Sequence, residues 1–139
     1  MKITVETVVK AEPSRVWEAW NNPAEITQWN SASDDWHTTR STVDLREGGT
    51  FTSRMESKDG SQGFDFGGTY TRVDPNKTIE YRMGDGREVK VEFVPQADGV
   101  LVKETFDAEN ENTPELQRQG WQSILDNFGK HVETKRVDR

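Results

Sequence analysis

The sequence predicts an α+β fold in which a curved antiparallel sheet of about seven strands wraps around one long C-terminal helix. Apolar residues recur every three or four positions between Thr113 and Val137, which is the pattern of an amphipathic helix. The chain before it reads as short strands separated by turn residues, apart from two short helices after the first strand. A long amphipathic helix that follows many strands must lie across the sheet to bury its apolar stripe.

The length of 139 residues fits one domain, and we expect a single domain over residues 1–139. Only 31% of the residues are hydrophobic, a low fraction that by itself would suggest disorder. Five tryptophans and six phenylalanines argue for a folded chain, because each large aromatic side chain can bury roughly 150–250 Å². The predicted core is therefore built from few, large side chains.

The formal net charge of −7 disfavours nucleic acids and anionic membrane surfaces as partners, because both require clustered lysine and arginine. The absence of cysteine excludes a disulfide, a thiolate nucleophile and a cysteine-ligated metal. No apolar run approaches the roughly 18–20 residues that span a bilayer, and the N-terminus lacks the apolar run of a signal peptide. We expect a cytoplasmic protein with no membrane insertion.

The N-terminal part is predicted to contain one strand and two short helices. Apolar and polar residues alternate from Ile3 to Ala11, which indicates a strand with one buried face. Pro13 suits the first turn of a helix, and Asn22 and Pro23 open a second one. Asn22 can cap that second helix, and Glu25 can reach back to the cap amide. The apolar faces of the two helices consist of Val16, Trp17 and Trp20, and of Ile26 and Trp29.

The middle of the chain is predicted to be a polar loop followed by an antiparallel meander. From Asn30 to Ser41 the sequence is polar and shows no periodicity, so we predict a loop. Asp59-Gly60 suits a tight hairpin, and similar turn residues separate the later strands. Gly67-Gly68 inside one strand predicts a bulge or a sharp bend. The six predicted strands are Ser41–Arg46, Thr50–Ser57, Gly63–Val73, Thr78–Met83, Arg87–Pro95 and Val100–Asp107.

The long helix is predicted to begin at Pro114, with Thr113 as its cap. Gly120 lies inside it, where glycine costs about 1 kcal/mol relative to alanine, so we predict a close approach of the sheet or of a ligand there. Gly129 is a second such position. The C-terminal part of the apolar stripe is predicted to seal the core, and the N-terminal half, around Trp121, to face a ligand.

Several short stretches carry a resemblance to a known family, and their order and spacing make it specific. They are Pro13–Trp20, Asn22-Pro23 with Trp29, Asp44–Phe51, Gly68–Tyr70 and Gly120–Phe128. With them the chain resembles the START and Bet v 1-like (SRPBCC) superfamily and, within it, the family named after the activator of the heat-shock-protein ATPase. This resemblance implies the helix-grip fold, with a cavity between sheet and long helix that takes an apolar or amphipathic small molecule, such as a lipid.

The resemblance implies little about chemistry, because the superfamily includes binders, transporters, cyclases and hydrolases. The eukaryotic co-chaperones of the family carry an additional N-terminal domain, whereas this chain begins directly at its first strand. We therefore expect no chaperone-stimulating role. A chaperone-interaction module stays as a minor alternative, and it would need an exposed apolar or strongly charged patch.

A surplus of aromatic residues offers candidates for the wall of a ligand cavity. Aromatic rings generally fill interiors, so core packing is the simpler explanation for most of them. The alternative is that the rings line a cavity. Few aliphatic residues accompany them, and rigid rings pack less completely than leucine and isoleucine. Trp36, in the polar loop, belongs to no apolar stripe and is predicted to be a lid over the cavity mouth or a plug for the open end of the sheet. The candidates are Trp20, Trp29, Trp36, Phe51, Phe66, Tyr70, Tyr81, Met83, Phe93, Trp121, Ile124 and Leu125.

Three residues are candidates for acid–base chemistry, although the sequence contains no catalytic motif. Asp35 and His37 lie two positions apart, and a carboxylate near a histidine can act in general acid–base catalysis. Such local spacing is common in solvated loops, which is the favoured interpretation. Asp65 lies between two phenylalanines, so strand alternation favours the outer face of the sheet over the cavity for its side chain.

Six charged residues of the strands are candidates for cross-strand ion pairs, which are mostly a surface feature. They are Arg54, Glu56, Arg82, Arg87, Glu92 and Glu104. One that faced inward would orient a polar group of a ligand, because a buried charge must be paired. Alternation with Val100 and Val102 allows Glu104 to be such a residue. The two histidines, His37 and His131, lack the spacing of a metal site, so we predict no metal and no cofactor.

The sequence therefore favours a protein that binds an apolar or amphipathic small molecule without catalysing a reaction. The alternative is an enzyme that uses the same cavity for hydrolysis, cyclisation or dehydration, with His37, Asp35 or Asp65 as acid or base. The pattern of residues names neither the ligand nor the oligomeric state.

Overall fold

The structure of the protein is a computed structural model that describes residues 1–134. It confirms the predicted α+β class, with two short helices after the first strand and one long helix after the last. The elements are β1 (Lys2–Val9), α1 (Pro13–Asn21), α2 (Pro23–Trp29), β2 (Trp36–Val43), β3 (Thr50–Ser57), β4 (Gly63–Asp74), β5 (Thr78–Met83), β6 (Glu88–Gln96), β7 (Gly99–Asp107) and α3 (Pro114–Thr134).

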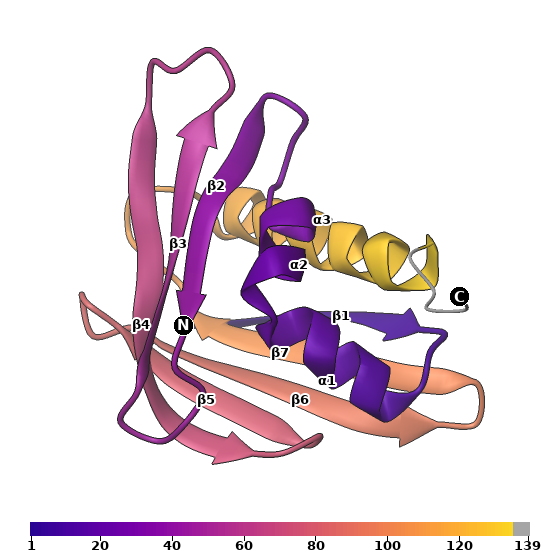
Figure 1. Ribbon diagram of the computed structural model, residues 1–139. Helices are drawn as coiled ribbons and strands as arrows, with labels where there is room; N and C mark the ends of the chain where they lie inside the picture. The colour runs from indigo at the N-terminus through magenta and orange to yellow at the C-terminus, as the bar shows by residue number, and fades with distance from the viewer. Residues whose placement is uncertain (135–139) are drawn as a thin grey trace.

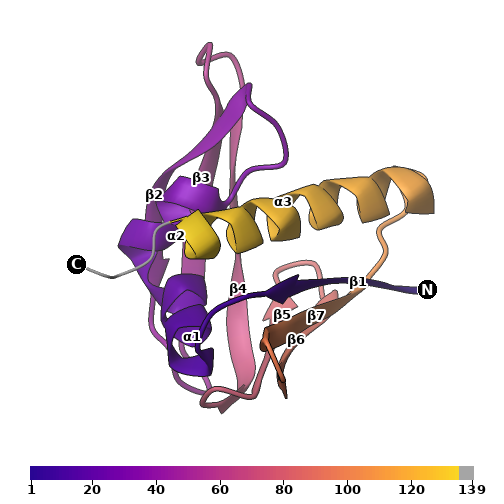
Figure 2. The same cartoon turned by 90° about the vertical axis from the view of Figure 1, so that its right-hand side faces the viewer.

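The seven strands form one antiparallel sheet in the order β1-β7-β6-β5-β4-β3-β2. The sheet is strongly curved: in Figure 1, β2, β3 and β4 stand upright while β6 and β7 run across the view. Helix α3 crosses the concave side above β1, and α1 and α2 lie near its C-terminal end (Figure 2). This is the predicted helix-grip arrangement.

The cap of α2 forms as predicted, but the role predicted for Glu25 is wrong. The side-chain oxygen of Asn22 accepts a hydrogen bond from the N–H of Ala24 at 3.0 Å. The carboxylate of Glu25 instead accepts hydrogen bonds from Arg15 and contacts His131. Charge-assisted hydrogen bonds to a guanidinium are about twice as strong as bonds between neutral groups, so they outcompete the cap amide.

Helix α3 begins as predicted. The hydroxyl oxygen of Thr113 accepts a hydrogen bond from the N–H of Leu116 at 3.2 Å, and Pro114 follows as the first helical residue. The described part of the helix ends at Thr134, and the predicted helical residues 135–137 lie outside the described residues. No helix in the described part of the chain is long and apolar enough to cross a membrane.

An aromatic cluster joins α3 to the two short helices. The ring of Phe128 packs edge-on against both Trp20 and Trp29, with centroids 4.9 Å apart in each case. The indole N–H of Trp29 donates a hydrogen bond to the carbonyl of Ala19 at 3.0 Å, so its one polar atom is satisfied inside the core. This cluster closes one end of the curved sheet, in agreement with the sealing role predicted for the C-terminal part of α3.

The predicted loop from Asn30 to Ser41 is wrong in its second half, because β2 begins at Trp36. Strand β2 pairs with β3 from Trp36, opposite Ser57, to Val43, opposite Phe51, with an irregularity after Thr38. It is the last strand of the sheet, and of its residues only Thr38 is fully buried. A polar edge strand needs only backbone pairing, so it carries no apolar alternation for a sequence pattern to reveal.

The double glycine in β4 does not form the predicted bulge. Gly67 and Gly68 pair regularly with Thr52 and Phe51, and the register shifts farther along, after Tyr70. A side chain has no room at either glycine, since a Cβ atom would lie 2.2 Å from a carbonyl oxygen of β3 at Gly67 and 2.6 Å from one of β5 at Gly68. The glycines therefore allow a close approach of backbones where the sheet bends.

Candidate functional site

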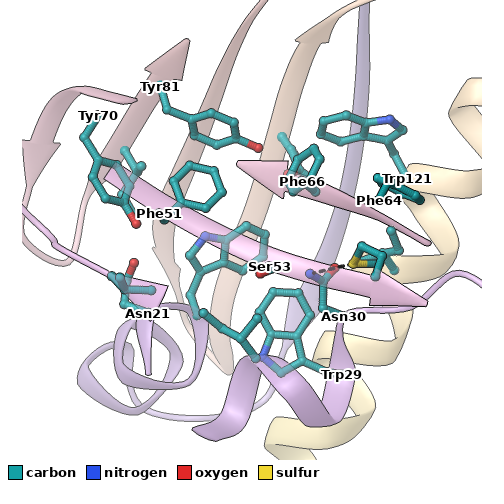
Figure 3. Close-up of a pocket in the computed structure, with 17 residues that line it drawn as sticks. Asn21, Trp29, Asn30, Phe51, Ser53, Phe64, Phe66, Tyr70, Tyr81 and Trp121 are labelled. Carbon is teal, nitrogen blue, oxygen red and sulfur yellow. Dashed lines mark hydrogen bonds between the residues drawn. The ribbon is translucent and has the colours of Figure 1, made fainter. Parts of the chain in front are cut away.

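A cavity of about 230 Å³ lies between the concave face of the sheet and helices α1, α2 and α3. We call it the main cavity. Figure 3 shows rings from the strands lining one side and Trp29 of α2 opposite them. Its wall is formed by Trp20, Asn21, Ile26, Trp29, Asn30, Val43, Phe51, Ser53, Met55, Phe64, Phe66, Tyr70, Ile79, Tyr81, Glu104, Trp121 and Ile124.

Strand alternation places the sheet residues in this wall. Phe51, Ser53 and Met55 occupy every second position of β3 and all face the main cavity. On the neighbouring strand, Phe66 lies opposite Ser53. The rings touch one another across strands, with Phe51 and Tyr81 arranged edge to face at a centroid distance of 4.7 Å. The result is an aromatic surface that belongs to the sheet rather than to a loop.

Glu104 is the one carboxyl group in this wall, and only 6% of its surface is exposed. It stands in β7 directly between Val5 of β1 and Val91 of β6, and Val91 in turn lies opposite Ile79 of β5. All three neighbours are buried and apolar. No hydrogen bond or ion pair joins the Glu104 carboxyl to any other residue in the range 1–134. Burial in these surroundings raises the pKa of Glu104 to about 8.

Two tyrosines add hydroxyl groups to the wall. Tyr70 and Tyr81 are each 5% exposed, and neither hydroxyl is hydrogen-bonded to another described residue. Burial raises the pKa of both phenols, and for Tyr81 the nearby carboxyl of Glu104 acts in the same direction. Both tyrosines are therefore neutral in the physiological range of pH. Because the part of the wall that the structure describes contains no lysine, arginine or histidine, Glu104 is the only group in that part that titrates near neutral pH.

Of the twelve residues predicted to line a cavity, eight lie in the wall of the main cavity. The other four are Trp36, which is described below, and three buried residues. Met83, Phe93 and Leu125 are buried but lie outside the wall. Phe93 instead packs edge-on against Trp17 of α1, with centroids 5.3 Å apart. The candidates in the wall are Trp20, Trp29, Phe51, Phe66, Tyr70, Tyr81, Trp121 and Ile124.

Trp36 lies beside the wall of the main cavity rather than in it. It begins β2, and its ring packs against Phe64 at a centroid distance of 5.8 Å, outside the wall of the main cavity. Its partner Phe64 does line the cavity, although 49% of its surface is exposed. The aromatic side chain nearest to the expected lid position is therefore Phe64, at the edge of the cavity.

Sequence reasoning missed the polar part of the wall. Ser53 gives no apolar signal, and its place follows only from alternation with Phe51 once the inner face of β3 is known. For Glu104 the sequence did contain an indication, because alternation with Val100 and Val102 allowed its side chain to lie on the inner face of the strand. The other residues that were not predicted are Asn21, Ile26, Asn30, Val43, Met55, Phe64 and Ile79.

The three acid–base candidates all lie outside the wall of the main cavity. Asp35 is exposed and accepts a hydrogen bond from the hydroxyl of Ser33 at 2.6 Å. Asp65 lies on the outer face of β4, 60% exposed and 3.5 Å from the guanidinium of Arg54. His37 lines a separate, open and mostly polar hollow. The wall of this hollow is formed by Thr27, Gln28, Ser31, Ser33, Asp34, Trp36, His37, Thr38, Lys58, Asn127, Lys130, His131 and Thr134.

A partly buried cluster of three ionisable residues lies where α1, α2 and α3 meet. The guanidinium of Arg15 donates two hydrogen bonds of 2.7 Å to Glu25, and His131 Nε2 lies 2.8 Å from the same carboxylate. The hydrogen bonds from Arg15 lower the pKa of Glu25, against the opposing effect of burial. The cluster joins three helices and none of its residues lines the main cavity, although His131 lines the open hollow, so we assign it a structural role.

Of the two explanations predicted for Gly120, the close approach of the sheet is wrong. A Cβ atom built at Gly120 would meet no atom within 4 Å, so neither the sheet nor another side chain crowds this position. At Gly129 a Cβ atom would meet the side chains of Thr7 and Val9 of β1 at 3.7–3.9 Å, which is ordinary contact. No three histidine, aspartate or glutamate side chains within residues 1–134 gather in the manner of a metal site.

The family model described as Activator of Hsp90 ATPase homolog 1-like protein matches residues 10–133. An AHSA1-like protein from Aeromonas hydrophila, solved by NMR, is 53% identical, with a TM-score of 0.91 and 96% of this chain and 93% of that chain covered. A protein from Cytophaga hutchinsonii is 46% identical, with a TM-score of 0.83 over 99% and 96% of the two chains. A protein from Nitrosomonas europaea, only 18% identical, shares the fold with a TM-score of 0.83 over 98% and 96%. No curated protein matches the chain.

Proposed function

The chain belongs to the family of Activator of Hsp90 ATPase homolog 1-like proteins, and from this premise and the geometry of the main cavity we propose that it binds an apolar or amphipathic small molecule between the sheet and α3. The observation that carries the proposal is the composition of the wall. Aromatic rings dominate it, and a few hydroxyl and amide groups and one carboxyl are set among them. Small-molecule sites are typically concave, mostly apolar and furnished with a few convergent polar groups.

The volume limits the size of the ligand. At about 230 Å³ the main cavity lies just below the range of roughly 300–1,000 Å³ that is usual for ligand pockets. The ligand that fits without rearrangement is therefore smaller than a drug-sized molecule, such as one ring with a short chain. A long acyl chain would require the wall to open, for which the exposed edge at Phe64 is the nearest place.

Tryptophan fluorescence tests the proposal directly, because Trp20, Trp29 and Trp121 lie in the wall. Titration with small aromatic alcohols should give a saturable change in emission. Ser53→Leu adds a larger apolar side chain inside the cavity and should abolish the change. Thr52→Leu, which makes the same kind of change on the outer face of β3, should leave it intact. The absence of any saturable response, or equal responses from both variants, would count against ligand binding in the main cavity.

A further inference from the structure

We propose that the ligand of the main cavity is a lipophilic amine whose ammonium group pairs with the carboxylate of Glu104. The inference rests on the proposed function and gives it a chemical class. It starts from the position of Glu104, a buried acid in the wall of the main cavity with apolar neighbours on both adjacent strands.

The protein itself supplies no partner for this carboxyl group. Its two cross-strand neighbours are valines, and within residues 1–134 no donor is hydrogen-bonded to it. Among the described residues, no cationic side chain stands elsewhere in the wall either. A buried carboxylate without a counter-charge is costly, and an apolar residue at this position would pack into the row of Ile79, Val91 and Val5 at no such cost. A cationic ligand would provide the missing counter-charge.

The rings around the acid suit a cation as well. Tyr81 lies close enough to Glu104 for the charge of the carboxylate to act on its phenol. Phe66 lies 6.4 Å from Tyr81 and 6.2 Å from Trp121, measured between ring centroids, and Figure 3 shows the three rings side by side. Aromatic faces attract an ammonium group, and the attraction grows as the group is desolvated. The same rings would hold the apolar body of the ligand.

Where Glu104 is ionised, the wall discriminates against the opposite charge. A carboxylate ligand, including a fatty acid, would then meet a like charge and no cationic side chain among the described residues of the wall, on a chain whose net charge is −7. An uncharged alcohol would accept or donate a hydrogen bond at Glu104 but would gain no ion pair. The expected order of affinity is therefore amine, then alcohol, then carboxylate.

Three probes with one apolar body test this order: 4-phenylbutylamine, 4-phenylbutanol and 4-phenylbutyrate, each titrated calorimetrically at pH 8. The amine should bind at least tenfold more tightly than the alcohol, and the carboxylate should be the weakest. Glu104→Gln should weaken the amine at least tenfold while the affinity for the alcohol changes less than threefold. Glu92→Gln, which removes the same charge from the outer face of β6, is the matched control and should leave all three affinities unchanged.

The pH dependence of the wild-type protein provides a test that needs no variant. Because the free protein holds a proton on Glu104 below pH 8, the affinity for the amine should rise about tenfold between pH 6 and pH 7. The affinity for the alcohol should stay flat. The other titratable groups in the wall, Tyr70 and Tyr81, stay neutral over this range, and an alkyl ammonium group stays charged.

The outcomes separate this inference from the proposed function. If the alcohol binds as tightly as the amine and Glu104→Gln leaves their ratio unchanged, the amine inference is overturned while the cavity remains a binding site. A pH-independent affinity for the amine overturns it in the same way. If none of the three probes binds the wild-type protein at millimolar concentration, the proposed function falls together with the inference.

Discussion

The indole of Trp121 lies flat on the ring of Phe106, with ring centroids 4.0 Å apart and planes 9° apart. The pair joins the N-terminal half of α3 to β7, two residues along the strand from Glu104. One side of the indole is thus fixed to the core while Trp121 also lines the main cavity. The stripe of α3 that packs on the core and the stripe that faces the main cavity share this residue.

Trp121→Ala should lower the free energy of unfolding by about 2–3 kcal/mol, less than the roughly 3–5 kcal/mol of a fully buried ring because Trp121 is partly exposed. Trp121→Phe keeps an aromatic ring on Phe106 and should lower it by about half as much or less. Urea denaturation of both variants measures the difference. Equal losses in the two variants would show that a ring packed on Phe106 at this position contributes no stability.

Glu104 should make the protein less stable as the pH rises from about 5 to 8. The folded pKa of about 8 lies above the usual value of 4.5, so the folded state binds more protons than the unfolded state between these two values. The free energy of unfolding should therefore fall as the pH rises, by up to about 1.4 kcal/mol per unit. Urea denaturation at pH 5.5, 6.5 and 7.5 measures this slope.

Glu104→Gln is the control for that slope, because the amide does not titrate. The variant should be more stable than the wild type at pH 7.5, and the difference should shrink toward pH 5.5. If the two proteins keep the same difference at all three pH values, Glu104 does not hold its proton in the folded state.

Glu25→Gln should lower the free energy of unfolding by about 1–3 kcal/mol, because the amide replaces a carboxylate that accepts two short hydrogen bonds from the partly buried Arg15 guanidinium. Glu18→Gln is the matched control: Glu18 also lies 3.5 Å from Arg15, but its side chain is 59% exposed, and the change should stay within about 0.5 kcal/mol. Thermal or urea denaturation at pH 7 compares the two. A loss of the same size in both variants would contradict the structural role assigned to Glu25.

The same carboxylate should set part of the acid sensitivity. The pKa of Glu25 is lowered in the folded state, chiefly by the hydrogen bonds from Arg15, so its contribution is complete above the usual value of 4.5. It should be lost as the pH falls below that value toward the folded pKa. This window lies below the one assigned to Glu104, so denaturation between pH 3 and 5 should report Glu25, and Glu25→Gln should reduce the slope there.

Gly120→Ala should stabilise the protein by about 0.5–1 kcal/mol, because the added Cβ meets open space and alanine favours a helix. Gly68→Ala should have the opposite sign and cost at least about 1–3 kcal/mol, since its Cβ would lie 2.6 Å from the backbone oxygen of Arg82. Melting temperatures of the two variants test both signs. A stabilised Gly68→Ala would mean that β4 and β5 can separate at this point without loss.

Patterns within a few residues predicted many elements of this protein correctly. The cap at Thr113 and the apolar spacing of the last helix determine α3, and Gly60, with a φ of +80°, makes the hairpin turn that Asp59-Gly60 predicted. The same local reasoning failed at β2, where a polar edge strand pairs through its backbone. It also failed at Gly120, whose glycine the described contacts do not explain.

The sequence by itself determined the α+β class, the order of the elements and the inner faces of the strands, because periodicity and turn residues act over short distances along the chain. Only the tertiary structure decided which inner-face residues surround empty space. Glu104 and Phe106 occupy equivalent alternating positions of β7, yet α3 covers Phe106 with Trp121 and leaves Glu104 at the cavity. That difference depends on where a helix from the end of the chain crosses a curved sheet, which no local pattern encodes.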